Sequence, residues 1–229
     1  MRIALVGATG LIGGKMIEAC VGREDVRLTG IARREARLPH GAKMELFVAE
    51  PAKWGEVIEA ARPYAMICAL GTTWKASGKD EAAFRSVDRD LVLSVAEAAR
   101  SQGVERFVHI SSVGADARSK SFYLRVKGEI ERELTRLKFP RLDILRPGLL
   151  LGERAGDRRT GERIGIAMAP LVNLLLHGRL RQYRGISAHM VAQAALGLAL
   201  RGARGRFVHD NDAIRRAANA LPRPDRDTA

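Results

Sequence analysis

Short apolar runs alternate with amphipathic stretches along the first two-thirds of the chain. Apolar runs rich in Val, Ile and Leu indicate buried strands, and a helical period between them indicates crossover helices. The predicted strands are 2–8, 26–33, 42–49, 64–71, 106–112 and 142–148, and the predicted helices are 11–21, 52–61, 80–102 and 121–137. Strands that alternate with helices and read as continuous apolar runs predict an α/β fold: a Rossmann-like, doubly wound parallel sheet with helices on both faces.

The pattern changes after Gly152. Residues 153–163 read as a loop, 164–178 as a helix broken by Pro170, 186–200 as a helix capped by Ser187, and 204–210 as a last strand. We therefore expect one domain over 1–221, with a small C-terminal helical extension whose substrate side lies mainly at 150–190. The polar tail 222–229 is expected to be disordered.

Composition limits the classes of partner. The 229 residues carry a formal charge of +13, yet the basic residues are scattered and aromatic residues make up only 5%. Nucleic acid is therefore not expected as a partner, because stacking platforms are missing, and a phosphorylated small molecule fits the basic clusters better. The two cysteines and five histidines show no metal-ligand spacing, so no metal is predicted. No apolar run is long enough for a membrane span, no targeting segment precedes the first strand, and a cytoplasmic protein is expected. An oligomer is left open.

Three glycines in "GATGLIG" lie between the first predicted strand and the first helix. Glycine permits a tight turn and lets the backbone approach a pyrophosphate, whose charge the helix N-terminus stabilises. The strand-turn-helix context is the one that dinucleotide binding requires. The expected cofactor-binding residues of this turn are Gly7, Thr9, Gly10, Leu11, Ile12 and Gly13.

Arg33 and Arg34 end the second strand, where a carboxylate would instead bind the adenosine ribose 2′-hydroxyl. Arginine pairs with a 2′-phosphate through two parallel hydrogen bonds, so NADP(H) is favoured over NAD(H). The alternative interpretation is a solvated basic loop. The loop after the fourth strand borders the same crevice, and its expected cofactor contacts are Leu70, Gly71 and Thr72.

Tyr123 and Lys127 are four residues apart on a predicted helix and so project from one face. A neighbouring ammonium ion favours the phenolate form of a tyrosine and makes it a usable acid or base. Ser112, at the end of the fifth strand, is the candidate that orients a reacting oxygen, with Ser111 as its rival. His109 is expected to be a packed core residue. The alternative for the tyrosine and lysine is an ordinary helix surface.

Five blocks of sequence together resemble a family, the atypical short-chain dehydrogenases/reductases of the Tat-interacting-protein-like NAD(P)H-binding type. They are "GATGLIG", "CALGTTWKASG", "FRSVDRD", "HISSVGADARSKSFYLRVKGEIE" and "LRPGLLLGER". The resemblance implies that Tyr123 exchanges the proton, that Lys127 also holds the nicotinamide ribose, and that Ser112 orients the substrate oxygen. It also implies that Pro147 and Gly148 lie near the nicotinamide. Asp88 stands where many relatives have an asparagine that organises a proton relay.

These observations favour an NADP(H)-dependent oxidoreductase that interconverts a carbonyl and an alcohol by hydride transfer on a modest, apolar small-molecule substrate. Two alternatives stay open. One is an NADP(H)-binding regulatory or scaffold protein with little turnover, and the other is a sugar-nucleotide epimerase or dehydratase, for which the C-terminal region is short.

Overall fold

The computed structural model describes residues 1–72, 77–151 and 177–222. Its main sheet has seven parallel strands in the order β3-β2-β1-β4-β5-β6-β9. Their bounds are β1 (Arg2–Val6), β2 (Arg27–Ala32), β3 (Met44–Val48), β4 (Ala65–Cys68), β5 (Arg106–Ile110), β6 (Arg141–Leu145) and β9 (Gly205–His209). The strand order reverses at β1, which pairs with β2 on one side and with β4 on the other. The predicted doubly wound parallel sheet is confirmed.

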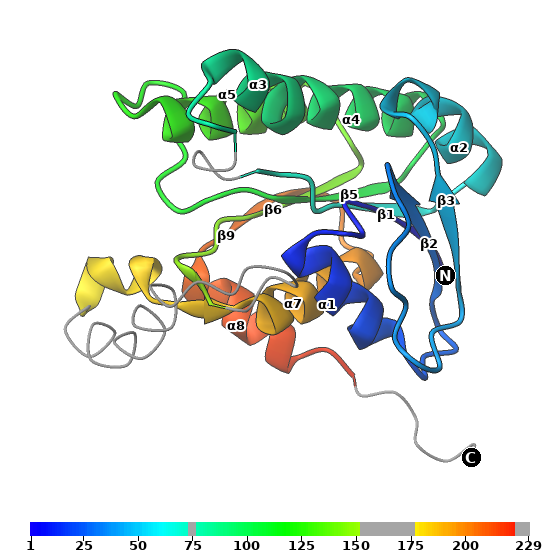
Figure 1. Cartoon of the computed structure of the whole chain (residues 1–229). Helices are drawn as coiled ribbons and strands as arrows, with labels where there is room; N and C mark the ends of the chain where they lie inside the picture. Colours follow the sequence, from blue (N-terminus) through cyan, green and yellow to red (C-terminus); the bar gives the residue numbers. More distant parts are fainter. Residues whose placement is uncertain (73–76, 152–176, 223–229) are drawn as a thin grey trace.

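Helices cover both faces of the sheet (Figure 1). One face carries α1 (Leu11–Cys20), α7 (Ala188–Leu200) and α8 (Asn211–Asn219). The other carries α2 (Trp54–Ala61), α3 (Glu81–Arg85), α4 (Leu91–Ser101) and α5 (Phe122–Arg136). Both faces of the sheet are therefore buried, which explains why its central strands read as continuous apolar runs.

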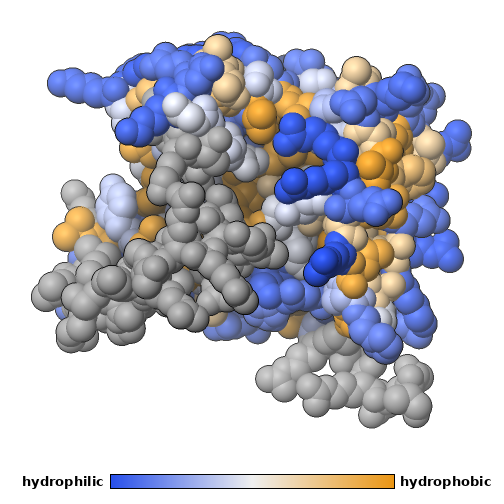
Figure 2. All heavy atoms as spheres, in the orientation of Figure 1, coloured by the Kyte–Doolittle hydropathy of each residue, from blue (hydrophilic) through white to orange (hydrophobic). Residues whose placement is uncertain are grey.

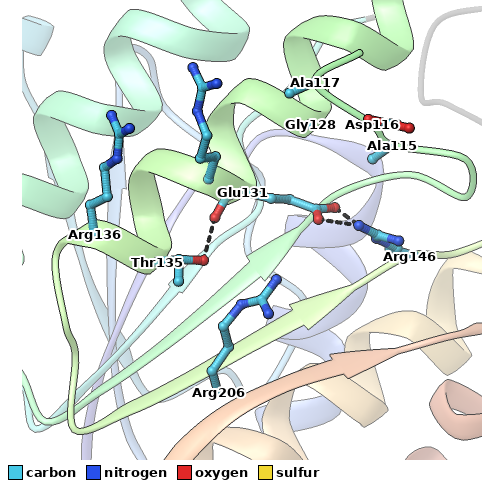
Figure 3. Close-up of a pocket in the computed structure, with 10 residues that line it drawn as sticks. Ala115, Asp116, Ala117, Gly128, Glu131, Thr135, Arg136, Arg146 and Arg206 are labelled. Carbon is cyan, nitrogen blue, oxygen red and sulfur yellow. Dashed lines mark hydrogen bonds and ion pairs between the residues drawn. The ribbon is translucent and has the colours of Figure 1, made fainter. Parts of the chain in front are cut away.

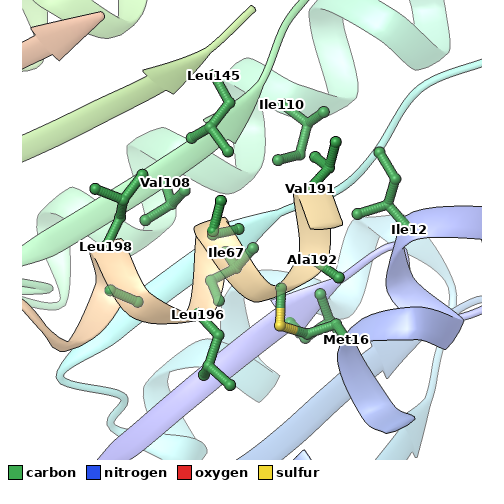
Figure 4. Packing of buried hydrophobic residues seen from close by; sticks show 14 of the residues in the cluster. Ile12, Met16, Ile67, Val108, Ile110, Leu145, Val191, Ala192, Leu196 and Leu198 are labelled. Carbon is green, nitrogen blue, oxygen red and sulfur yellow. The ribbon is translucent and has the colours of Figure 1, made fainter. Parts of the chain in front are cut away.

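Two apolar clusters hold these layers together. Successive side chains of a strand point to opposite faces, so Ile3 and Leu5 join one cluster while Ala4 and Val6 join the other. Figure 4 shows the first cluster, in which side chains of α1 and α7 pack on the sheet. Five buried alanines on α7 let this helix approach the strands closely. This packing fixes the N-terminus of α1 against the end of β1.

The predicted helix 80–102 is wrong in one respect, because it is not continuous. The α3 helix passes into a π-helical turn (η2, Ser86–Asp90) before α4 begins. Single π turns inside helices are found often at functional sites. Here the wider turn carries Asp88, which is fully buried although it is charged. Periodicity alone does not register this insertion, because the apolar spacing on either side of it stays helical.

The C-terminal part contains elements that the pattern did not predict. The α8 helix begins after Asp210, whose carboxylate accepts a hydrogen bond from the Ala213 amide, and it buries Ile214. Two short strands, β7 (Leu150–Leu151) and β8 (Ile186–Ser187), pair in parallel beside the main sheet. Two 3-10 turns, η1 (Pro51–Lys53) and η3 (Gly178–Tyr183), complete the described elements. The predicted cap of α7 is confirmed, since Ser187 accepts from the Met190 amide.

Several predictions fall on residues that the structure does not describe. The loop predicted at 153–163 and all but the last two residues of the broken helix at 164–178 lie outside the described residues. The same holds for the tail from 223 onward. Among the described helices, none combines the length and the apolar character that a bilayer crossing needs.

Candidate active site

The glycine turn closes directly over the ends of β1 and β4. Gly7 has a φ of +90°, and a Cβ on it would lie 2.7 Å from the carbonyl carbon and oxygen of Ala69. A Cβ on Gly13 would lie 2.1 Å from the Gly7 carbonyl oxygen. Both positions therefore require glycine: Gly7 brings the turn close to the backbone that follows β4, and Gly13 packs the first turn of α1 on Gly7. The cradle formed in this way, with amide groups at a helix N-terminus, fits the pyrophosphate of a dinucleotide.

A cavity of about 690 Å³ runs along the carboxyl ends of the central strands. In Figure 2, which shows the face of Figure 1, a hollow with apolar atoms at its floor lies next to strongly hydrophilic side chains. Ten of the predicted site residues line this cavity: Thr9, Gly10, Leu11, Ile12, Arg34, Leu70, Gly71, Thr72, Tyr123 and Lys127. Gly7 and Arg33 line a neighbouring cavity of about 420 Å³ that shares the turn and the loop after β4. The crevice thus lies at the point where the strand order reverses, as expected for a nucleotide site.

The loop after β2 supplies positive charge to one end of the crevice. Arg33, Arg34 and Arg37 are exposed, and none of them makes a hydrogen bond or ion pair with the described part of the chain. Their guanidinium groups are therefore free to bind an anion. Sequence reasoning missed Arg37, which lines the main cavity beside Arg34 and lies three residues beyond it. It also missed Lys15 of α1, which lines the same cavity.

Tyr123 and Lys127 come from the first half of α5 and face the other end of the cavity. The ammonium nitrogen of Lys127 lies 5.9 Å from the centroid of the Tyr123 ring. The same nitrogen donates to the Asp88 carboxylate at 2.6 Å, and the second carboxylate oxygen accepts from the Thr72 amide at 2.7 Å. Lys127 is 3% exposed and Asp88 is 0% exposed. Asp88, which stands where many relatives were expected to have an asparagine, therefore joins Lys127 directly to the loop that borders the cavity.

The two serines at the end of β5 lie in different surroundings. Ser111 is buried, lines the main cavity, and donates its hydroxyl to Glu131 at 2.6 Å. Ser112 is half-buried and is absent from the described lining of that cavity. Its hydroxyl makes a 3.3 Å contact with the carbonyl of Val113. Ser111, rather than Ser112, thus lines the cavity that Tyr123 and Lys127 also line.

Three further predicted residues do not line the cavity in the described structure. Gly13 lies in the first turn of α1 and packs against the backbone of Gly7 and Ala8. Pro147 accepts a hydrogen bond from the Val113 amide. Gly148 packs so closely on the carbonyl of Arg184 that a Cβ would lie 2.3 Å from that oxygen. The turn at 147–148 therefore joins the loop after β5 to the segment before β8.

Two buried titratable groups lie near Lys127 without taking part in the cavity. Burial, with a smaller effect of the Lys127 charge, lowers the pKa of His109 to about 3, so this side chain is a neutral core residue, as expected. Burial raises the pKa of the Cys68 thiol to about 12. Neither group changes its charge near neutral pH. Within the described residues there is also no cluster of ligands that could hold a metal ion.

Comparison with known proteins identifies the same region of the chain. A family model described as NAD(P)H-binding matches residues 7–166. The mitochondrial protein FMP52-1 of Scheffersomyces stipitis is 33% identical over 87% of this chain and 88% of its own. The mitochondrial protein FMP52 of Saccharomyces cerevisiae is 38% identical over 70% of this chain and 71% of its own. The expectation of a cytoplasmic protein is wrong on this evidence, because the names of the curated relatives point to mitochondria.

Solved structures with a similar fold carry nucleotides. MoeE5 in complex with UDP-glucose and NAD matches with a TM-score of 0.69 at 15% identity, over 98% of this chain and 83% of its own. The UDP-glucose 4-epimerase of Thermus thermophilus, in complex with NAD, matches with a TM-score of 0.69 at 20% identity, over 95% and 82%. At such identities the likeness establishes the fold and leaves the reaction open.

Proposed function

The chain belongs to the NAD(P)H-binding family, and on this premise we propose that it is an NADP(H)-dependent oxidoreductase of the atypical short-chain dehydrogenase/reductase type that interconverts a carbonyl and an alcohol. The observation that carries the proposal is the convergence of Tyr123 and Lys127 on the cavity that the glycine turn opens. When bound, the nicotinamide cofactor supplies or accepts the hydride. Everything else in the reaction is the work of this chain's own residues.

The protein's task at the reacting end is to move one proton. The Tyr123 hydroxyl gives a proton to the substrate oxygen during reduction and takes it back during alcohol oxidation. The Lys127 ammonium nitrogen lies 5.9 Å from the centroid of this ring, which places a positive charge near the reacting oxygen. Lys127 has three N–H donors, of which Asp88 takes one, so further donors remain for the hydroxyls of a ribose. Asp88 keeps this buried ammonium in one place.

The preference for NADP(H) is supported by the loop after β2. A 2′-phosphate brings negative charge to this end of the crevice, where the unpaired guanidinium groups of Arg33, Arg34 and Arg37 supply positive charge. Glu18 and Glu35 also line the cavity, but Glu18 pairs with Lys15 and Glu35 is exposed, so positive charge exceeds negative charge there. Arginine pairs with a phosphate more strongly than with a ribose hydroxyl.

The substrate is proposed to be a modest and largely apolar carbonyl compound. Ile110 and Leu150 line the same cavity as Tyr123, so part of its described wall is apolar. Part of the predicted pocket, around Pro170, lies outside the described residues. Purified protein should therefore be titrated with NADPH and NADH by calorimetry and then tested for NADPH oxidation with a panel of aldehydes and ketones. Tight NADPH binding with no turnover on any member would instead favour a regulatory cofactor-binding protein.

A further inference from the structure

Three polar residues form a stripe along α5, and the proposed reaction uses only two of them. Tyr123, Lys127 and Glu131 are spaced four residues apart and therefore lie on one face of the helix. Tyr123 and Lys127 line the main cavity, whereas Glu131 lies one turn further along the helix and is 3% exposed. A buried carboxylate costs several kcal/mol unless it is compensated, so its partners indicate what it does.

Glu131 is held from two sides. Figure 3 shows its carboxylate pointing to Arg146, the residue that directly follows β6. Arg146 lines a separate cavity of about 550 Å³. Arg146 donates from Nε at 3.0 Å and also from Nη2, and the carboxylate raises the pKa of this guanidinium. From the other side, the Ser111 hydroxyl lies 2.6 Å from the carboxylate oxygen Oε1. Glu131 thus links an arginine outside the crevice to a serine inside it.

The direction of the serine hydrogen bond follows from the chemistry of the carboxylate. An ionised carboxylate only accepts hydrogen bonds, so the single hydroxyl proton of Ser111 must point to Glu131. The Ser111 oxygen then keeps only acceptor lone pairs for a partner in the cavity that it lines. A substrate carbonyl offers acceptors alone and cannot pair with it. The amide group of a nicotinamide carboxamide offers two N–H donors and can.

We propose that Ser111, held by Glu131 and Arg146, is a hydrogen-bond acceptor that binds the carboxamide N–H₂ of the cofactor's nicotinamide. This inference rests on the proposed function. Ser111 is the binding residue in it, and Glu131 and Arg146 are positioning residues. Tyr123 and Lys127, which are both donors, remain to serve the acceptor oxygens of the substrate and of the ribose.

The test compares NADP⁺ with its 3-acetylpyridine analogue, in which a methyl group replaces the carboxamide N–H₂. Both affinities are measured by calorimetry, and their ratio is the readout. The wild-type protein should prefer NADP⁺ by roughly three- to tenfold, the range expected for one neutral hydrogen bond. Ser111→Ala should bring the ratio close to one. Loss of folding stability alone would weaken both ligands equally and leave the ratio unchanged.

Matched variants make the result specific. Ser112→Ala changes the neighbouring serine and should keep the wild-type ratio. Glu131→Gln should lower it, because the glutamine amide can donate to Ser111 and compete with the carboxamide. Ser111→Cys, with a weak acceptor of similar size, provides a second variant should Ser111→Ala not fold. A ratio that stays at the wild-type value in Ser111→Ala, or a wild-type ratio near one, overturns the role of Ser111 but leaves the proposed function intact. A wild-type protein that binds neither NADP⁺ nor NAD⁺ overturns the proposed function as well.

Discussion

Lys127→Met should cost stability as well as function, because it leaves the Asp88 carboxylate buried without its counter-charge. Asp88 is 0% exposed, and after the change the Thr72 amide, 2.7 Å away, is its remaining hydrogen-bond donor among the described residues. Removing one partner of a buried ion pair typically costs about 3–5 kcal/mol. For a domain of this size each kcal/mol lowers Tm by roughly 2–4 °C, so the total loss should be roughly 6–20 °C. Urea unfolding followed by circular dichroism gives the free energy directly.

The double variant Asp88→Asn/Lys127→Met separates the two effects. It removes both charges, and an asparagine oxygen can still accept from the Thr72 amide, so most of the lost stability should return while the lost cofactor affinity should not. Lys15→Met is the matched control, since Lys15 pairs with Glu18 at 2.8 Å on the surface. Such exposed pairs contribute ~1 kcal/mol or less. The reasoning fails if Lys127→Met is no less stable than Lys15→Met, or if the double variant is less stable than Lys127→Met.

Two further predictions address the arginines of the loop after β2 and the buried histidine His109. Arg34→Ala should weaken NADPH binding by roughly tenfold or more and leave NADH binding unchanged, because a charge-assisted hydrogen bond is worth about 1.5–3 kcal/mol. Arg27→Ala, at the other end of β2, is the control and should change neither affinity in calorimetry. Equal losses for both cofactors would count against a phosphate site. The pKa of His109 falls from 6.5 to about 3 on folding, so below pH 6.5 only the unfolded chain takes up this proton and stability is lost. When the pH is lowered from 7 to 5, the free energy of unfolding of His109→Leu should rise by ~2 kcal/mol relative to that of the wild type, as measured by urea unfolding. If the difference between the two proteins does not change with pH, the histidine is not a neutral buried group.

The parallel sheet and the cofactor turn could be predicted from the sequence because local patterns encode them. An apolar strand followed by spaced glycines specifies both the β1 element and the close approach at Gly7. The sequence likewise placed Tyr123 and Lys127 on one helical face, which the structure confirms. Such features depend on residues that are close together in the chain.

Features that depend on distant residues were not predictable in the same way. The pairing of Asp88 with Lys127 joins residues 39 positions apart and needs a π turn that leaves no trace in the apolar period. The orientation of Ser111 depends on Glu131, 20 positions away, and this favours Ser111 over Ser112 as the serine that faces the cavity. A signal existed for Glu131, since it continues the four-residue spacing of Tyr123 and Lys127.

The most direct test of the proposed function is the rate of NADPH-dependent carbonyl reduction in Tyr123→Phe, measured beside NADPH affinity with the best substrate of the panel. Because the phenolic proton serves the chemical step, turnover should fall by about 10²-fold or more. NADPH affinity should stay near the wild-type value, and Tyr64→Phe, which changes an exposed tyrosine outside the cavity lining, should leave both quantities unchanged. Near-normal turnover in Tyr123→Phe would contradict the account, because Tyr123 would then be only part of a helix surface.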